Sequence, residues 1–127
     1  MKHLLLDTHV VLWAFSQPER LPATVRAEIT DPRNVVLVSA ASIWEVEIKR
    51  ALGKLRAPDG LHVLCVERGF DPLDISFEHA VRAGSLPVHH ADPFDRMLVA
   101  QALVEGAAVV TADPVFERYG VDVVPVG

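Results

Sequence analysis

Hydrophobic residues in this chain gather in short runs that alternate with longer stretches of helical periodicity. An apolar run of four to six residues is too short for a buried helix and is typical of a strand inside a parallel sheet. Such runs predict strands at His3 to Leu6, Val35 to Val38, Ala107 to Val110 and, as an edge strand, Val121 to Val126. Phe70 to Ile75 gives a weaker extended segment, because Pro72 interrupts it.

Helix signals lie between these runs. Ser39 and Asp92 are residue types that cap helix N-termini, and Gly53 and Gly106 are typical of positions just after a helix. Helices are predicted at Val10 to Phe15, Ala23 to Thr30, Ala40 to Leu52, Gly60 to Arg68, Ser76 to near Gly84 and Asp92 to Glu105, with a short one near Phe116. Alternating strands and helices indicate an α/β fold with a central sheet of four or five mainly parallel strands and helices on both faces.

The composition favours one folded domain over residues 1–127. Half of the 127 residues are hydrophobic and 23% are charged, which allows a chain of this length to bury a core. Cys65 is the one cysteine and has apolar neighbours, so it suits a buried thiol in a reducing compartment. No run has the length of a signal-peptide core or a membrane span, so we expect a cytoplasmic protein with no membrane partner.

The formal net charge of −5 argues against a protein that holds nucleic acid through a broad basic surface. It does not exclude nucleic acid, because divalent metal bound by clustered carboxylates would neutralise much of that charge. Local basic groups could then meet phosphates, and Lys49, Arg50, Lys54 and Arg56 are the candidates. The alternative is a solvated helix end whose cations favour the helix dipole.

Four acidic residues are expected to meet at one edge of the sheet. Asp7 and Asp113 follow predicted strands, and Glu45 and Asp95 lie in the first half of helices that begin at that edge. Carboxylates this close raise one another's pKa unless a cation is shared. Oxygen-only sites favour Mg²⁺, with Mn²⁺ as a substitute, and commonly process phosphate esters. The expected chemistry is metal-assisted phosphodiester hydrolysis.

Each acid also has a simpler interpretation. Asp92 and Asp113 each precede a proline and can serve as helix N-caps, and Asp95 in the first helical turn suits the helix dipole. Glu45 is harder to explain in this way, since it lies on a largely apolar helix, and Asp7 follows three leucines directly. The argument for a site therefore depends on the joint placement of these residues, with Asp92 as an auxiliary.

Several neighbouring polar residues could assist such a site. Thr8 and Thr111 could hold metal-bound water, or could cap the local backbone. Arg96 could neutralise the acids or contact phosphate, or could form a surface salt bridge. His89 and His90 are adjacent, which makes joint ligation of one metal unfavourable, and are interpreted as loop residues that could lie near a substrate.

Four segments resemble, in order and spacing, the PIN-domain toxins of the VapC type: LLLDTHVVLW, SAASIWEVEIK, LPVHHADPFDRMLVAQA and VVTADPVF. Together they span almost the whole chain. The resemblance implies a PIN-like fold and an acidic quartet that holds one or two Mg²⁺ or Mn²⁺ ions, formed by Asp7, Glu45, Asp95 and Asp113, with Asp92 auxiliary.

The resemblance also implies a biological role as the toxin of a type II toxin–antitoxin pair. Such a protein would be an endoribonuclease that cleaves single-stranded regions of RNA and inhibits translation. Its partners would be a second copy of itself and a small VapB-like antitoxin that blocks the site. Contact with DNA would occur only through the antitoxin, when the pair represses its own promoter.

Two other interpretations remain open at this point. A receiver-like phosphotransfer domain also places an aspartate and Mg²⁺ at strand ends, but here Asp7 is followed by Thr8 and no lysine occurs beyond Lys54. Nucleotide binding lacks support, since neither a GxGxxG nor a GxxxxGK[ST] string occurs. The second is a non-catalytic binding module whose acids are caps and surface charges.

Overall fold

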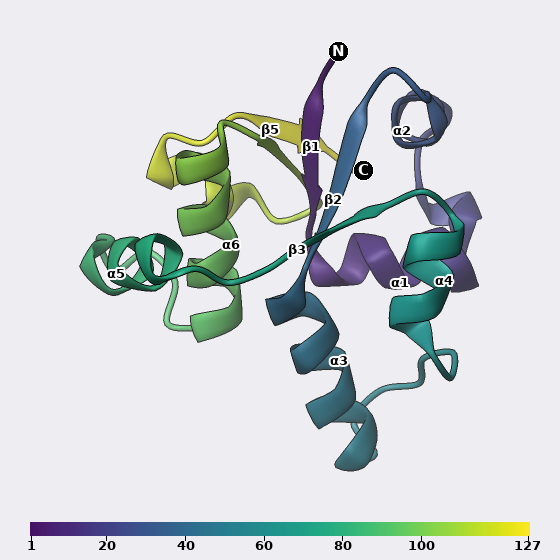
Figure 1. Ribbon diagram of the computed structural model, residues 1–127, viewed down its shortest axis with the longest axis horizontal. Coiled ribbons are helices and arrows are strands. Elements are labelled where there is room, and N and C mark those ends of the chain that lie inside the picture. Colours follow the sequence, from purple (N-terminus) through teal and green to yellow (C-terminus); the bar gives the residue numbers. More distant parts are fainter.

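The computed structural model describes residues 1–127 and is built on one parallel sheet of five strands (Figure 1). The strand order is β3-β2-β1-β4-β5. The strands are β1 (His3–Leu6), β2 (Val35–Ser39), β3 (Asp71–Leu73), β4 (Ala108–Thr111) and β5 (Val123–Pro125). All four pairings are parallel, as predicted, and the two weakest predicted strands, β3 and β5, lie at the edges.

Helices cover both faces of this sheet. They are α1 (Thr8–Ser16), α2 (Ala23–Thr30), α3 (Ala40–Ala51), α4 (Leu61–Glu67), α5 (Phe77–Ser85) and α6 (Pro93–Glu105), with short 3₁₀ helices η1 (Pro18–Arg20) and η2 (Pro114–Tyr119). Helices α1, α2 and α4 lie on one side of the central strands and α5 and α6 on the other, whereas α3 extends beyond their carboxyl ends (Figure 1). None of these helices is long and apolar enough to cross a membrane.

The strand order distinguishes between the interpretations of the sequence. A receiver-like domain has the flavodoxin-like order 2-1-3-4-5, in which the first strand lies between the second and third. Here β1 lies between β2 and β4. The receiver-like alternative is therefore wrong.

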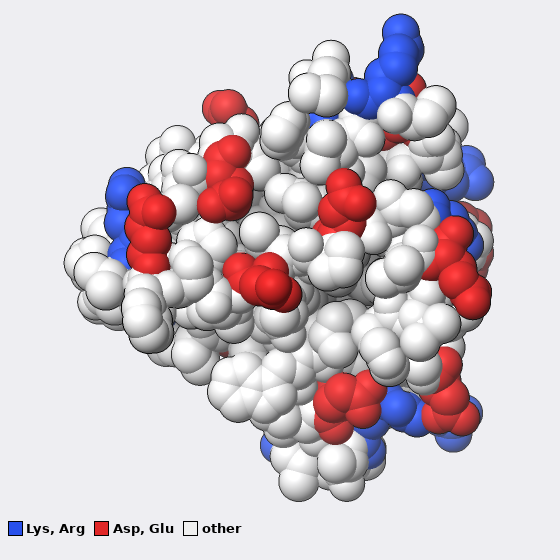
Figure 2. Space-filling view, in the orientation of Figure 1, with Lys and Arg blue, Asp and Glu red and all other residues white.

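Positive charge is dispersed on the face of the molecule drawn in Figure 2. Lysine and arginine atoms occur there in separate groups near the edges, with acidic groups and uncharged surface between them (Figure 2). Arg50, in the predicted basic group, pairs with Glu47 and Asp59. This face carries no broad basic surface, as the net charge predicts.

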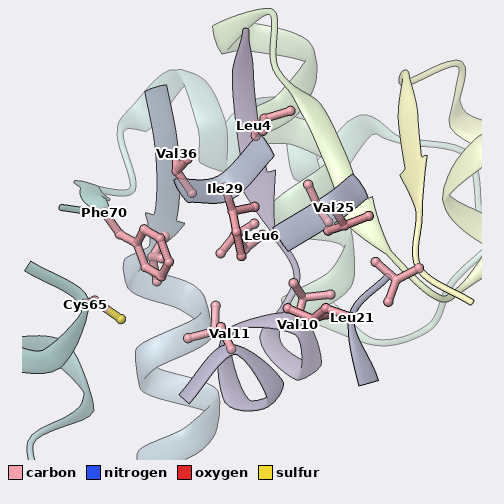
Figure 3. Close-up of a cluster of buried hydrophobic side chains, with 14 of the residues drawn as sticks. Leu4, Leu6, Val10, Val11, Leu21, Val25, Ile29, Val36, Cys65 and Phe70 are labelled. Atoms are coloured by element: carbon pink, nitrogen blue, oxygen red, sulfur yellow. The ribbon is translucent and has the colours of Figure 1, made fainter. Parts of the chain in front are cut away.

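The core lies on both sides of β1. Leu4 and Leu6 pack with Val25 and Ile29 of α2 in one cluster, which Figure 3 shows, whereas Leu5 packs with Leu98 on the opposite face. Side chains alternate between the two faces of a strand, so a central strand covered on both sides must be apolar throughout. This explains why β1 appears in the sequence as a continuous apolar run.

Cys65 lies in the first of these clusters as a buried free thiol, as predicted. Burial raises the pKa of this thiol to about 11, so the thiol stays protonated and behaves as a small apolar group.

Two local features differ from the prediction. Helix α1 begins at Thr8, two residues before the predicted start, because Asp7 caps it and accepts a hydrogen bond from the Val10 N–H at 2.9 Å. The η1 turn has no counterpart in the prediction, since three residues are too few for a periodic pattern. The carboxyl ends of β1, β2 and β4 therefore lead directly into α1, α3 and η2 at one edge of the sheet.

Candidate active site

Asp7 occupies the centre of this edge, directly after β1. Its Oδ1 caps α1, and its Oδ2 accepts a hydrogen bond from the hydroxyl of Thr111 at the end of β4. The side chain is only 7% exposed, and burial raises its pKa, although these hydrogen bonds act in the opposite direction. A cation close to Asp7 would stabilise its ionised form.

Glu45 reaches the same place from the second turn of α3 and is 4% exposed. Thr8 Oγ1 donates to its Oε1 at 2.7 Å, and Lys49 Nζ donates to its Oε2 at 2.5 Å. Glu45 and Lys49 are four residues apart and therefore lie on the same face of α3. Both carboxylate oxygens of Glu45 thus have a partner within the protein.

Asp92 and Asp95 stand at the start of α6. Asp92 Oδ1 accepts from the backbone N–H groups of Phe94, at 2.8 Å, and Asp95, at 3.3 Å, so Asp92 is the predicted N-cap. The pKa of Asp95 is raised to about 7, first by burial and then by the neighbouring carboxylates, with Asp92 the largest contributor among them. The acids therefore lie close enough to disfavour one another's charge.

Asp113 completes the group from the loop after β4. Its Oδ1 caps η2 by accepting from the Val115 N–H at 2.9 Å. Its Oδ2 lies 3.2 Å from His90 Nε2, and the other ring nitrogen of His90 is 3.9 Å from Asp95 Oδ2. The Tyr119 hydroxyl accepts from the His90 N–H at 2.6 Å, which holds the histidine loop against η2.

These side chains enclose one cleft of about 120 Å³. It is lined by Asp7, Thr8, His9, Glu45, Lys49, Asp92, Asp95, Asp113 and Phe116. The four acids expected to meet do so, together with the auxiliary Asp92 and Thr8, while Thr111 supports Asp7 from below the cleft. Such a set of carboxylate oxygens is suited to a hard divalent cation.

Arg96 does not take any of the roles that the sequence suggested. Its guanidinium donates to the backbone carbonyl oxygens of Ala83, Leu86 and Pro87 at 2.9 to 3.0 Å. Arg96 therefore fixes the connection between α5 and α6 instead of neutralising the acids.

Three residues reach the acids that the sequence reasoning did not place in the site. His9 and Lys49 line the cleft, and ligand atoms of His90, Asp95 and Asp113 lie within 4.8 Å of one another. The spacing of four residues from Glu45 could have identified Lys49. Neither His9 nor His90 has a comparable signal, since the path of the loop before α6 decides where His90 lies.

The model of one protein family, the PIN domain, matches residues 4–122. The chain is also 38% identical over 68 residues to a curated relative, Ribonuclease VapC16 of Mycobacterium tuberculosis. That match covers 49% of this chain and 48% of the relative, so it spans about half the length of each.

Solved structures of similar fold cover nearly the whole chain. A DNA-bound VapBC structure from Salmonella typhimurium matches with a TM-score of 0.73, 20% identity and complete coverage of both chains. VapBC2 from Rickettsia felis, bound to a DNA fragment from its promoter, matches with a TM-score of 0.71 and 16% identity over 97% of this chain and 98% of that one. FitAcB from Neisseria gonorrhoeae has a TM-score of 0.65 and 23% identity over 94% and 95%. The sheet order, the acidic edge and the match over residues 4–122 lead to one assignment: this chain belongs to the PIN domain family.

Proposed function

We propose that this protein is a metal-dependent endoribonuclease and the toxin of a VapBC-like pair. The observation that carries the proposal is the convergence of Asp7, Glu45, Asp95 and Asp113, from four different segments, on one small cleft. Burying several carboxylates together is costly, as the raised pKa of Asp95 illustrates, and a divalent cation relieves that cost.

The residues present fit a Mg²⁺ or Mn²⁺ ion. Asp7, Asp95 and Asp113, with Glu45 beside them, would hold it through carboxylate oxygens. A bound ion would supply Lewis-acid stabilisation of the charge that develops on a phosphate during hydrolysis. The chain itself contributes orientation, since the Thr111 hydroxyl fixes one oxygen of Asp7 and backbone N–H groups fix one oxygen each of Asp92 and Asp113.

An aromatic surface beside the acids supports single-stranded RNA as the substrate. The rings of Trp44 and Phe94 lie 5.2 Å apart, and each of these residues directly precedes an acid of the cleft, Glu45 or Asp95. Trp44 is 60% exposed. Exposed aromatic rings can stack on unpaired bases, which are accessible in single strands and loops of RNA. A base on Trp44 would bring its phosphate towards the cleft.

An apolar hollow supports an antitoxin partner. It measures about 450 Å³, lies among α3, α4 and the end of β2, and is lined mainly by apolar side chains that include Ile43, Trp44 and Val66. The VapBC structures of similar fold contain such partners. We propose that a VapB-like chain covers this hollow and the adjoining cleft, and that any contact with DNA occurs through that chain.

The remaining parts of the proposal follow from the same activity. The chain would act as one PIN domain over residues 1–127, in the cytoplasm and as a homodimer. Cleavage of cellular RNA would inhibit translation.

The test is cleavage of total RNA by the purified chain, with the ends mapped by sequencing. We expect cutting with Mg²⁺ or Mn²⁺, none in EDTA, and none by Asp7→Asn. Asp74→Asn is the matched control, because Asp74 is exposed and does not line the cleft. Circular dichroism checks that both variants fold. Cutting in EDTA, or by Asp7→Asn, would contradict the proposal.

A non-catalytic binding module would behave differently in a thermal-shift titration. Mn²⁺ that binds the clustered acids should raise the melting temperature beyond an ionic-strength control. A shift with no RNA cleavage would indicate a metal-binding module and not a nuclease.

A further inference from the structure

The ion pair between Glu45 and Lys49 places a positive charge inside the acidic cleft. The Lys49 ammonium lies 2.5 Å from Glu45 Oε2, and the Thr8 hydroxyl occupies Glu45 Oε1 at 2.7 Å. The Glu45 side chain is 5% exposed, so water does not compete freely for these oxygens. Glu45 is therefore neutralised and fully hydrogen-bonded by the protein itself, unlike the other acids of the cleft.

The other acids form a separate group. Asp7 Oδ2 is bound by Thr111, and Asp113 Oδ2 faces His90, which also lies beside Asp95. None of these three aspartates pairs with a lysine or arginine. The cleft is thus divided into an uncompensated half, with Asp7, Asp95 and Asp113, and a compensated half, with Glu45 and Lys49.

The size of the cleft sets a second limit. About 120 Å³ is available, and a water molecule takes roughly 30 Å³ of liquid volume. The space therefore holds one small ion with about three water molecules. Two-metal sites place their ions about 3.5 to 4 Å apart and need additional ligands for the second ion. The free oxygens for that second ion are the ones that Lys49 and Thr8 occupy.

We propose that this centre binds a single divalent ion between Asp7, Asp95 and Asp113, and that the Lys49 ammonium, held by Glu45, takes the place of a second ion. This inference rests on the proposed nuclease function for its meaning, since Lys49 would supply the second positive charge that faces the phosphodiester. Glu45 acts on the substrate through Lys49 and is a positioning residue, which differs from the direct metal ligand that the sequence suggested.

The test counts Mn²⁺ ions per chain by titration, with free Mn²⁺ measured by electron paramagnetic resonance. We expect one ion in the wild type and in Lys49→Arg, which keeps the charge. We expect two ions in Lys49→Met, because Glu45 then has a free oxygen, and the close pair should give the multiline spectrum of coupled Mn²⁺. Lys54→Met is the control, since Lys54 is exposed and lies outside the cleft.

The double variant Glu45→Gln, Lys49→Met avoids an unpaired buried carboxylate and should bind one ion. Two ions in the wild type would overturn the inference, and so would a single ion in a folded Lys49→Met. If Lys49→Met folds only with Mn²⁺, the count is made on the protein refolded in Mn²⁺. These measurements need no RNA, so a chain that binds one ion and cuts nothing would refute the nuclease proposal separately.

Discussion

Replacing Asp95 by asparagine should stabilise the metal-free protein at neutral pH. The side chain is 27% exposed, and its pKa is raised from 3.8 to about 7 by burial and by the surrounding carboxylates. Asparagine has nearly the same shape but carries no charge. The substitution therefore removes the electrostatic cost of ionising Asp95 while it preserves most of the packing.

The size of the effect follows from the raised pKa. Below about pH 4 Asp95 is protonated in both the folded and the unfolded chain, and it does not affect stability. As the pH rises towards 7 the unfolded chain releases this proton and the folded chain keeps it, so the free energy of unfolding falls. Above pH 7 the full cost applies, about 4 kcal/mol, since a tenfold change in an equilibrium constant is worth about 1.4 kcal/mol.

Urea unfolding in EDTA, near pH 4 and above pH 7, measures this effect. Asp95→Asn should match the wild type at the acidic pH and exceed it by up to about 4 kcal/mol at the higher pH. Asp74→Asn should follow the wild type at both. Saturating Mn²⁺ should reverse the order, because the wild type gains more from the ion. An equal difference between the two proteins at every pH would refute the reasoning.

Three further substitutions test the packing around the site, each by urea unfolding in EDTA. Thr8→Val leaves Glu45 Oε1 without its hydroxyl donor and should cost about 1 to 3 kcal/mol, whereas Thr8→Ser should cost less; equal losses would contradict this. Arg96→Met removes the bonds to three carbonyl oxygens and should cost about 1 to 3 kcal/mol with unchanged Mn²⁺ binding; weaker binding would place Arg96 in the site. Leu5→Ala, in the fully buried centre of the sheet, should cost about 2 to 5 kcal/mol, and a loss well below 1 kcal/mol would show that β1 is not central to the core.

Most of the fold could be predicted because its strongest elements leave local signals. The central strand β1 must be apolar on both faces, so it appears as an uninterrupted run, and α6 carries both its cap at Asp92 and its terminating Gly106. The start of α1 was missed because apolar periodicity begins at Val10, whereas the helix begins where Asp7 can cap it. Hydrogen bonding, and not hydrophobicity, sets that boundary.

The site could be predicted only where topology determines it. Residues at the carboxyl ends of neighbouring parallel strands must converge, which brought Asp7 and Asp113 together. Arg96 was assigned wrongly because adjacent residues of a helix do not face each other, so its side chain points away from Asp95. Lys49 was named but interpreted as a helix-end charge, since a lysine in the last turn is favourable with or without a site. Its contact with Glu45 depends on how α3 extends beyond the sheet.

Capping and catalysis are not competing explanations for the acids at the strand ends. Asp7 and Asp113 each use Oδ1 to accept a backbone N–H at the start of a helix. Each directs Oδ2 elsewhere, Asp7 to the Thr111 hydroxyl and Asp113 to His90. The cap removes the rotational freedom of the carboxylate, which makes the position of the second oxygen certain at no further cost in side-chain entropy. A helix start that follows a parallel strand thus orients a carboxylate towards the shared edge, and this is why several caps at one edge can form a metal centre.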